Sequence, residues 1–129
     1  MMARILVVDD IAELRDILRQ HLEALGHEVD EACDASAAMA RLSAATFDLV
    51  ITDILMPGAD GFELLNALRR SHAALPVIAT SGGGRMMDAE LALRLSRDLG
   101  AFGMLRKPVR RAELLEAVAA ALNAPPSRE

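Results

Sequence analysis

Short apolar runs alternate with segments of helical period along the chain, and this alternation restricts the fold more than any other feature of the sequence. The runs occupy residues 4–8, 27–32, 47–52, 77–80 and 102–105, and the second of them is a weaker, more polar strand signal. After each run, hydrophobic residues return every three or four positions, as they do on one face of an amphipathic helix. We therefore predict five β-α units. Because near-continuous apolar strands are typical of sheets covered on both faces, the strands are expected to form a parallel sheet between helices.

The helical segments also predict which side chains point inward. In the first segment the inward residues are expected to be Ile11, Leu14, Ile17, Leu18, Leu22 and Leu25. In the last segment they are expected to be Leu114, Leu115, Val118 and Leu122. Gly26 is placed to end the first helix and Asp34 to cap the second, and a fourth helix is expected over residues 91–99.

The order of these elements leaves few possible topologies, because crossovers between parallel strands are right-handed. We predict an α/β fold of the flavodoxin-like, doubly wound (βα)5 type, with a five-stranded parallel sheet of order 2-1-3-4-5. The chain has 129 residues, and 53% of them are hydrophobic, which fits one packed domain. We expect this domain over residues 1–123 and a disordered tail over residues 124–129, which contain two consecutive prolines.

Composition also bears on location and partners. The apolar runs are too short to cross a bilayer, and the chain starts directly with the first run, so we expect neither membrane contact nor a secretory leader. The single cysteine, Cys33, cannot form an internal disulfide, so a cytoplasmic protein is expected. The net charge of -5 argues against direct binding to nucleic acid. Residues 85–111 are rich in arginine and form either a solvated face or a docking surface for an acidic partner.

Polar residues follow four of the five apolar runs. Asp9 and Asp10 follow the first, Asp53 the third, Ser81 the fourth and Lys107 the fifth. In open parallel α/β sheets, ligands bind beyond the carboxyl ends of the strands. Strands one and three are neighbours in the predicted order, so the three carboxylates are expected to converge. A hard divalent cation such as Mg²⁺ would remove the cost of holding these like charges together.

These positions indicate roles for the acidic residues. Asp53 lies at a strand-to-loop corner, where its carboxylate can act as a nucleophile. Asp10 and one oxygen of Asp53 are expected to hold Mg²⁺, with Asp9 binding directly or through water. The backbone carbonyl of Leu55 is a further candidate ligand.

The remaining site residues are suited to binding a phosphoryl group. Lys107 is the only lysine in a chain with 14 basic residues, and its ammonium is a compact positive charge. Together with Mg²⁺ it is expected to neutralise phosphoryl oxygens. The Ser81 hydroxyl and the Gly82 amide are expected to bind another oxygen, because Gly82 has no side chain to block the approach.

Taken together, the motifs resemble a known family. They are Leu6-Val7-Val8-Asp9-Asp10, Asp53-Ile54-Leu55-Met56-Pro57, Asp60-Gly61, Pro76-Val77-Ile78-Ala79-Thr80-Ser81 and Lys107-Pro108. With these pieces in this order over residues 4–122, the chain resembles the receiver domain of bacterial two-component response regulators, of the single-domain, chemotaxis-regulator-like type. Each piece alone is weak, and the complete ordered set is specific.

The resemblance implies a function. Receivers take a phosphoryl group from a phosphohistidine on a sensor histidine kinase or a histidine phosphotransfer protein. They catalyse their own phosphotransfer and dephosphorylation and are not enzymes in the usual sense. The acceptor matches Asp53, the metal-binding pair Asp9 and Asp10, the hydroxyl Ser81 and the lysine Lys107. The resemblance also implies a cis peptide bond between Lys107 and Pro108.

Three positions depart from the family pattern. The family's switch pairs the hydroxyl, here Ser81, with a tyrosine or phenylalanine in strand five, and this chain has Met104 there. An apolar residue, Leu55, lies two positions after the acceptor, where relatives often carry a polar or small one. Arg110 stands where a helix-capping residue is usual. With methionine at position 104, any conformational switch is expected to differ in form from the hydroxyl-aromatic switch of the family.

The remaining polar residues have no expected role in the site. His21, His27 and His72 are scattered along the chain and are expected on the surface or at helix ends. Cys33 is expected to be a small core residue or a thiol at a strand end.

Three functions compete for this sequence. The first is a response regulator without a fused output domain, since the chain ends at Glu129. It would signal to a downstream protein by contact, or relay its phosphoryl group onward. The alternative is a receiver-like interaction module that is not phosphorylated, which Met104 slightly favours. A third reading, an FMN-binding flavodoxin-like protein, fits the fold but lacks a Ser/Thr-rich phosphate loop and any Trp or Tyr to stack on a flavin.

Overall fold

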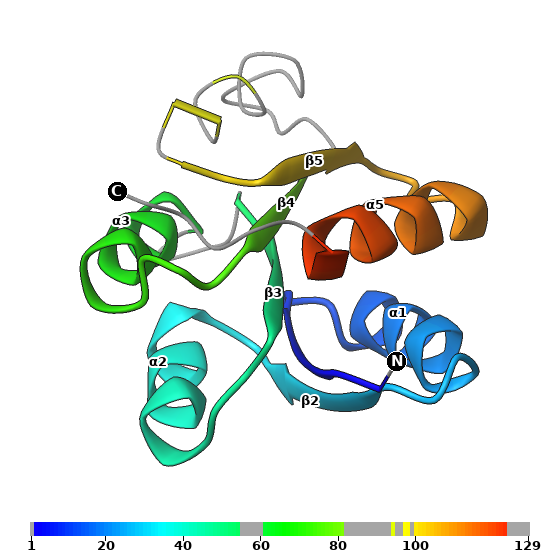
Figure 1. Cartoon of the computed structure of the whole chain (residues 1–129), viewed down its shortest axis with the longest axis horizontal. Coiled ribbons are helices and arrows are strands. Elements are labelled where there is room, and N and C mark those ends of the chain that lie inside the picture. Colours follow the sequence, from blue (N-terminus) through cyan, green and yellow to red (C-terminus); the bar gives the residue numbers. More distant parts are fainter. Residues whose placement is uncertain (1, 55–60, 82–93, 95–96, 99, 124–129) are drawn as a thin grey trace.

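The computed structural model describes residues 2–54, 61–81, 94, 97–98 and 100–123, which form a parallel sheet covered by helices (Figure 1). The strands are β1 (Arg4–Val8), β2 (Glu28–Ala32), β3 (Leu49–Asp53), β4 (Val77–Ser81) and β5 (Gly103–Arg106). The helices are α1 (Ala12–Glu23), α2 (Ala35–Ala44), α3 (Gly61–Ser71) and α5 (Arg111–Asn123). All the strand pairs are parallel, and the order β2-β1-β3-β4-β5 confirms the predicted topology.

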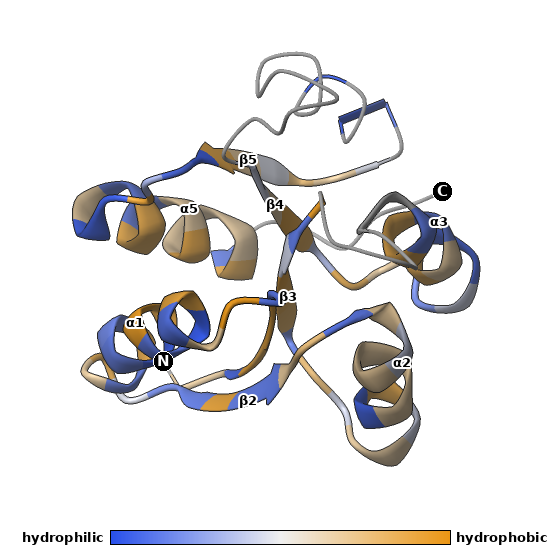
Figure 2. Ribbon diagram, turned by 180° about the vertical axis from the view of Figure 1, so that it is seen from behind, coloured by the Kyte–Doolittle hydropathy of each residue, from blue (hydrophilic) through white to orange (hydrophobic). Residues whose placement is uncertain are grey.

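The helices lie in two layers, one on each face of the sheet. Helices α1 and α5 cover one face, and α2 and α3 cover the other (Figure 1). The strands between them are predominantly hydrophobic in the centre of the molecule (Figure 2). This arrangement explains why the central strands β1, β3 and β4 are mostly apolar in sequence. A strand that is covered on both faces has almost no side chain in contact with water.

Each layer of helices packs on its own hydrophobic cluster. The α2/α3 cluster includes Leu6, Val8, Ala38, Leu42, Val50, Ile54, Leu65 and Leu68. The α1/α5 cluster includes Ile5, Val7, Leu18, Leu22, Leu49, Ile51, Ile78, Leu114 and Val118. Consecutive side chains of β1 enter the two clusters in turn, as the two-residue period of a strand requires.

The predicted N-cap of α2 is confirmed, whereas α1 ends at Glu23 with Ala24 as its C-cap, two residues before the predicted Gly26. Gly26 follows α1 with φ of 93°, a conformation that glycine adopts without strain. Asp34 is the N-cap of α2, and its side chain accepts a hydrogen bond of 2.8 Å from the Ala37 amide. The helix begins where a side chain replaces the missing partner of a first-turn N–H group.

The predicted inward face of α1 is partly wrong. Leu18 and Leu22 are buried, but Ile11 is 44% exposed and Ile17 and Leu25 are each 48% exposed. The apolar stripe is wider than the contact that α1 makes with the sheet. Some of the apolar side chains of this stripe, including Ile17, line the open pocket that is described below. In α5 the buried residues are Leu114, Val118 and Ala121, while Leu115 and Leu122 are half-buried.

The expectation that His27 lies on the surface or at a helix end is also corrected. His27 is buried, and its Nδ1 accepts a hydrogen bond of 3.0 Å from the Ala3 backbone amide. The ring can be buried because this bond satisfies its acceptor nitrogen. Burial lowers the pKa of His27 below its ordinary value of 6.5. Cys33, by contrast, is exposed just after β2, which matches the predicted strand-end thiol and not the core residue.

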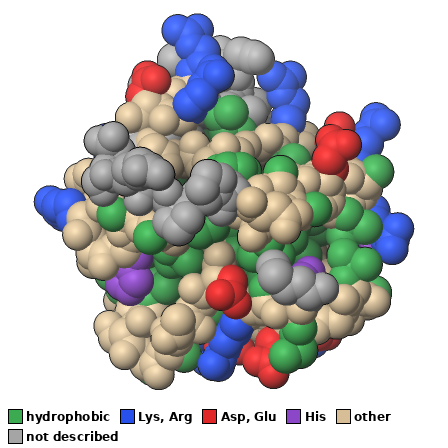
Figure 3. Space-filling model, viewed as in Figure 1, with side chains coloured by type: hydrophobic (Ala, Val, Ile, Leu, Met, Phe, Trp, Pro, Cys, Tyr) green, Lys and Arg blue, Asp and Glu red, His purple; other side chains and the backbone are tan. Residues whose placement is uncertain are grey.

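Several predictions lie outside the described residues. They concern the Leu55 carbonyl, the Gly82 amide, most of the helix expected over residues 91–99, and the tail at 124–129. Among the described residues, no helix is long and apolar enough to cross a membrane. On the face shown in Figure 3, the Lys and Arg side chains are spread around the outline of the molecule, as solvated surface charges are.

Candidate functional site

Three aspartates converge at the carboxyl ends of β1 and β3, as predicted. One carboxylate oxygen from each of Asp9, Asp10 and Asp53 lies within 4.8 Å of the others. The two strands are adjacent, and Val8 of β1 is in register with Thr52 of β3, so the residues that follow them lie side by side. Asp9 and Asp53 are buried and Asp10 is exposed. The cluster is therefore a buried acidic pair with a third carboxylate on its solvent side.

Lys107 supplies positive charge to this cluster. Its Nζ lies 2.9 Å from Oδ2 of Asp9 and 3.0 Å from Oδ2 of Asp53, and its side chain is only 19% exposed. Burial by itself would lower the pKa of Lys107, but the hydrogen bonds and charges of the two carboxylates outweigh this effect and raise the pKa above 10.5. The ammonium thus stays charged and bridges two side chains that would otherwise repel each other.

The backbone around Lys107 places its side chain at the cluster. The Lys107 amide donates a hydrogen bond of 2.9 Å to the Ser81 carbonyl, which ties the end of β5 to the end of β4. The peptide bond between Lys107 and Pro108 is cis, as the family resemblance implied. The lysine therefore reaches the carboxylates from the strand end that topology predicts.

Ser81 is the last residue of β4 and is fully buried beside the acidic strand end. Its neighbour Thr80 is in register with Asp53, and the Thr80 carbonyl accepts a hydrogen bond of 3.1 Å from the Ile54 amide. Ser81 and Asp53 are thus at the same edge of adjacent strands. Met104 is half-buried in β5 and in register with Ala79, two residues before Ser81.

Every polar group of Asp9, in its backbone and in its side chain, has a hydrogen-bond partner. Its amide donates to the Ala32 carbonyl at 3.1 Å, and its Oδ1 accepts from the Ile11 amide at 2.9 Å. Its backbone carbonyl accepts a hydrogen bond of 2.6 Å from Nη1 of Arg15. Arg15 is a site residue that the sequence does not predict, because a contact to a backbone carbonyl leaves no pattern of paired side chains in the sequence.

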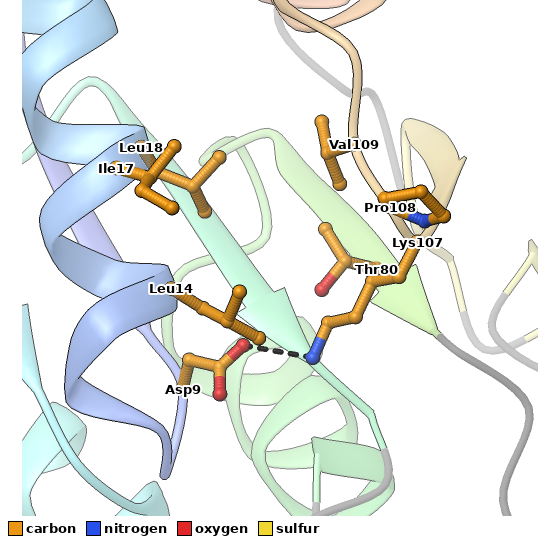
Figure 4. Close-up of a pocket in the computed structure, with 8 residues that line it drawn as sticks. All are labelled: Asp9, Leu14, Ile17, Leu18, Thr80, Lys107, Pro108 and Val109. Carbon is orange, nitrogen blue, oxygen red and sulfur yellow. Dashed lines mark hydrogen bonds and ion pairs between the residues drawn. The ribbon is translucent and has the colours of Figure 1, made fainter.

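A pocket of about 370 Å³ opens beside the cluster, between α1 and the segment that leads into α5 (Figure 4). Its lining residues are Asp9, Leu14, Ile17, Leu18, Thr80, Lys107, Pro108 and Val109. Figure 4 shows the apolar side chains of α1 on one side, with Pro108 and Val109 across from them and the Asp9–Lys107 ion pair between. The acidic cluster therefore adjoins an accessible apolar surface.

The oxygen ligands of the cluster fit a hard divalent cation. Carboxylates are the ligands that Mg²⁺ prefers, and this ion keeps several of its waters, so it needs a site with an open side. Exposed Asp10 provides that side, while Asp9 and Asp53 provide buried oxygens. The three carboxylates carry more negative charge than Lys107 alone can balance, so a cation is also favoured electrostatically.

A doubly wound α/β domain with a cluster of carboxylates and one ammonium at the carboxyl edge of its sheet defines a class: phosphoacceptor signalling domains of the flavodoxin-like fold. The family model that matches is the response regulator receiver domain, over residues 5–119. The chain belongs to this family.

Curated relatives agree with this assignment. The chain is 36% identical over 110 residues to the sensor protein EvgS of Escherichia coli K12, covering 85% of this chain and 9% of that protein. It is 34% identical over 126 residues to the DNA-binding transcriptional regulator NtrC of Rhizobium meliloti, covering 98% of this chain and 25% of that protein. The chain thus spans a quarter or less of the length of these two relatives.

Solved structures of receiver domains are also similar. The receiver domain of NtrX from Brucella abortus has a TM-score of 0.86 and 32% identity, covering 94% of this chain and 99% of that one. The chemotaxis response regulator CheY4 of Vibrio cholerae has a TM-score of 0.83 and 30% identity, covering 95% of this chain and 100% of that one. The similarity covers 94% and 95% of this chain, as the predicted fold class requires.

Proposed function

We propose that this chain accepts a phosphoryl group onto Asp53 from the phosphohistidine of a sensor histidine kinase or a histidine phosphotransfer protein, with Mg²⁺ as cofactor. The observation that carries the proposal is the bridge from Nζ of Lys107 to Asp9 and Asp53, at 2.9 and 3.0 Å, inside a cluster of three carboxylates. Phosphoryl transfer depends mostly on positioning and on neutralisation of charge, and these groups can provide both.

The residues have distinct tasks in this reaction. An oxygen of Asp53 attacks the phosphorus and forms the P–O bond, while the P–N bond of the donor breaks and its electron pair returns to the imidazole. Lys107 already touches Asp53 and can hold an oxygen of the incoming group by a charge-assisted hydrogen bond. Asp9, Asp10, Asp53 and the Leu55 carbonyl are the proposed metal ligands. Bound Mg²⁺ supplies further positive charge for the phosphoryl oxygens.

Residues at the ends of the strands would respond to the phosphoryl group. Ser81 and Gly82 are proposed to bind a phosphoryl oxygen, because the end of β4 lies beside that of β3. A movement of Ser81 would then be transmitted to Met104 on the neighbouring strand, with the flexible thioether repacking where relatives have an aromatic ring. Hydrolysis of the acyl phosphate by water, catalysed in the same pocket, would end the signal.

The apolar pocket favours a protein donor. A phosphohistidine must come within bonding distance of Asp53, so its carrier must cover the surface next to the cluster. Ile17 is 48% exposed at this surface, and burial of its side chain would stabilise the encounter. We propose that the domain, over residues 1–123, works in the cytoplasm without direct contact to nucleic acid or membrane. It would signal to a downstream protein by contact or by phosphorelay.

The alternative is a receiver-like interaction module that is never phosphorylated. Met104 in place of the family's aromatic residue is the observation that favours it. The complete acidic cluster and its lysine count against it, because an unused cluster of buried carboxylates would be costly to keep. The family assignment favours both of these functions over an FMN-binding redox protein.

Labelling with acetyl phosphate, with and without Mg²⁺, tests the proposal. Intact mass is the readout, and the variants are Asp53→Ala, Lys107→Arg and the control Asp98→Ala, which removes an exposed aspartate. We expect one phosphoryl adduct that requires Mg²⁺, persists in the control, and is lost in Asp53→Ala. An adduct that survives Asp53→Ala would show a different acceptor. No adduct and no Mg²⁺ binding in the unmodified protein would favour the interaction module.

A further inference from the structure

Arg15 of α1 joins the strand β2 to the acidic cluster through two hydrogen bonds. Its Nη1 donates to the backbone carbonyl of Asp9 at 2.6 Å, and its Nε donates to Oε1 of Glu31 at 2.9 Å. The Arg15 side chain is only 17% exposed, so these bonds are partly shielded from water. Charge-assisted bonds of this kind are stronger than those between neutral groups.

The carbonyl that Arg15 binds belongs to the peptide unit between Asp9 and Asp10. A peptide unit is planar, so fixing its carbonyl also fixes the direction in which the chain leaves toward Asp10. The Asp9 amide and carboxylate are held by other partners, and Arg15 holds the one remaining backbone group of that residue. The orientation of this peptide unit thus depends on the guanidinium.

Asp10 has the least support of the three clustered aspartates. Its carboxylate is exposed and makes no hydrogen bond or ion pair within the part of the chain that the structure describes. Within the described residues, the position of this carboxylate therefore depends on its backbone. Any freedom of the Asp9–Asp10 peptide would therefore move the Asp10 carboxylate relative to Asp9 and Asp53.

Glu31 keeps the guanidinium in place. Its second oxygen, Oε2, forms an ion pair with Nε of Arg19 at 3.0 Å, so two arginines of α1 contact one carboxylate of β2. Arg15 and Arg19 share this partner, the same helix and the same charge. Only Arg15 reaches Asp9, which makes Arg19 a matched control.

We propose that Arg15 is a positioning residue for the metal site: held by Glu31, it orients the Asp9–Asp10 peptide and thereby presets Asp10 for binding Mg²⁺. This inference rests on the proposed function, because it assumes that the cluster binds the ion. Loss of a group that orients metal ligands typically weakens metal affinity about 10- to 100-fold. A planar fork with several donors suits a carbonyl and a carboxylate at once, whereas a lysine ammonium does not.

The test measures the Mg²⁺ dissociation constant by titration calorimetry for the unmodified protein, Arg15→Gln, Arg15→Lys and Arg19→Gln. We expect affinity to fall roughly 10-fold in Arg15→Gln, less in Arg15→Lys, and less than about twofold in Arg19→Gln. The rate of labelling by acetyl phosphate should need more Mg²⁺ in Arg15→Gln and reach the unmodified rate at saturation. A general disturbance of the fold would lower the saturated rate as well.

Two results would overturn the inference alone: unchanged affinity in Arg15→Gln, or an equal loss in Arg19→Gln, which would assign the effect to the shared charge network. If Arg15→Gln does not fold, the folded Arg15→Lys variant decides, and unchanged affinity there refutes the proposal. Absence of Mg²⁺ binding in the unmodified protein would refute the proposed function together with this inference.

Discussion

Replacing Lys107 by methionine should destabilise the domain most strongly when no Mg²⁺ is present. Methionine keeps much of the length of lysine but has no charge, so Asp9 and Asp53 would lose the ammonium that bridges them at 2.9 and 3.0 Å. Both carboxylates are buried and would repel each other. Added Mg²⁺ should recover part of the loss, because a bound cation replaces the missing positive charge.

The size of the effect follows from the burial of the three groups. Removing one partner of a buried ion pair destabilises a protein by about 3–5 kcal/mol. The Lys107 side chain is 19% exposed, so we expect the lower end of that range, about 3 kcal/mol. A ligand present at ten times its dissociation constant stabilises the folded state by about 1.4 kcal/mol. Lys107 competes with the ion for the carboxylates, so Mg²⁺ should stabilise Lys107→Met more than the unmodified protein.

Urea denaturation followed by far-UV circular dichroism measures both effects, in a chelator and in Mg²⁺, and it suits a chain without Trp or Tyr. Arg110→Met is the control, because it removes one positive charge from an exposed position near Lys107. The reasoning would be refuted by a free energy of unfolding for Lys107→Met within about 0.5 kcal/mol of the unmodified value in chelator, as for a surface substitution. The reasoning would also be refuted if Mg²⁺ did not reduce the difference in free energy of unfolding between Lys107→Met and the unmodified protein.

Two further predictions concern stability away from the cluster. Burial lowers the pKa of His27 below 6.5, so the unfolded chain binds a proton more readily than the folded chain does. The free energy of unfolding should therefore decrease as the pH falls from 6.5 toward the lowered pKa. His27→Gln should make the free energy of unfolding, measured by urea denaturation, less dependent on pH over this range. An equal dependence on pH in the variant and the unmodified protein would contradict this prediction. Asp34→Ala should lower the free energy of unfolding by about 1 kcal/mol, since the Ala37 amide loses its cap, whereas Asp34→Asn should retain most of it.

The strands and their order could be predicted because the covered sheet leaves a strong signal. Each strand in the structure overlaps a predicted apolar run, and its ends differ from the prediction by at most two residues. The face of α1 could not be predicted equally well. Hydrophobic spacing shows which residues share a helix face, but how wide a contact that face makes depends on the neighbouring elements. Ile17 is exposed for this reason, while Ile11 and Leu25 lie just beyond the two ends of α1.

The candidate site could be predicted where topology determines it. Asp9 and Asp53 lie at the ends of strands that the predicted order places side by side, and Lys107 follows a strand that ends at the same edge of the sheet, so their convergence follows from the fold and the length of the lysine side chain. The Arg15 contact could not be predicted, because a long side chain has many directions and its acceptor is a backbone atom. The burial of His27 depends on a hydrogen bond between residues 24 positions apart, which spacing along one element cannot reveal.

The division of the core into two clusters has a thermodynamic consequence. The sheet separates the α1/α5 cluster from the α2/α3 cluster, so a cavity made in one leaves the packing of the other intact. Losses of stability from Leu18 and Leu68, which lie in different clusters, should therefore add, while those from Leu18 and Leu114, in the same cluster, can be coupled. One helical layer can thus accumulate substitutions with little effect on the stability that the other layer provides, while both layers remain attached to the site through β1.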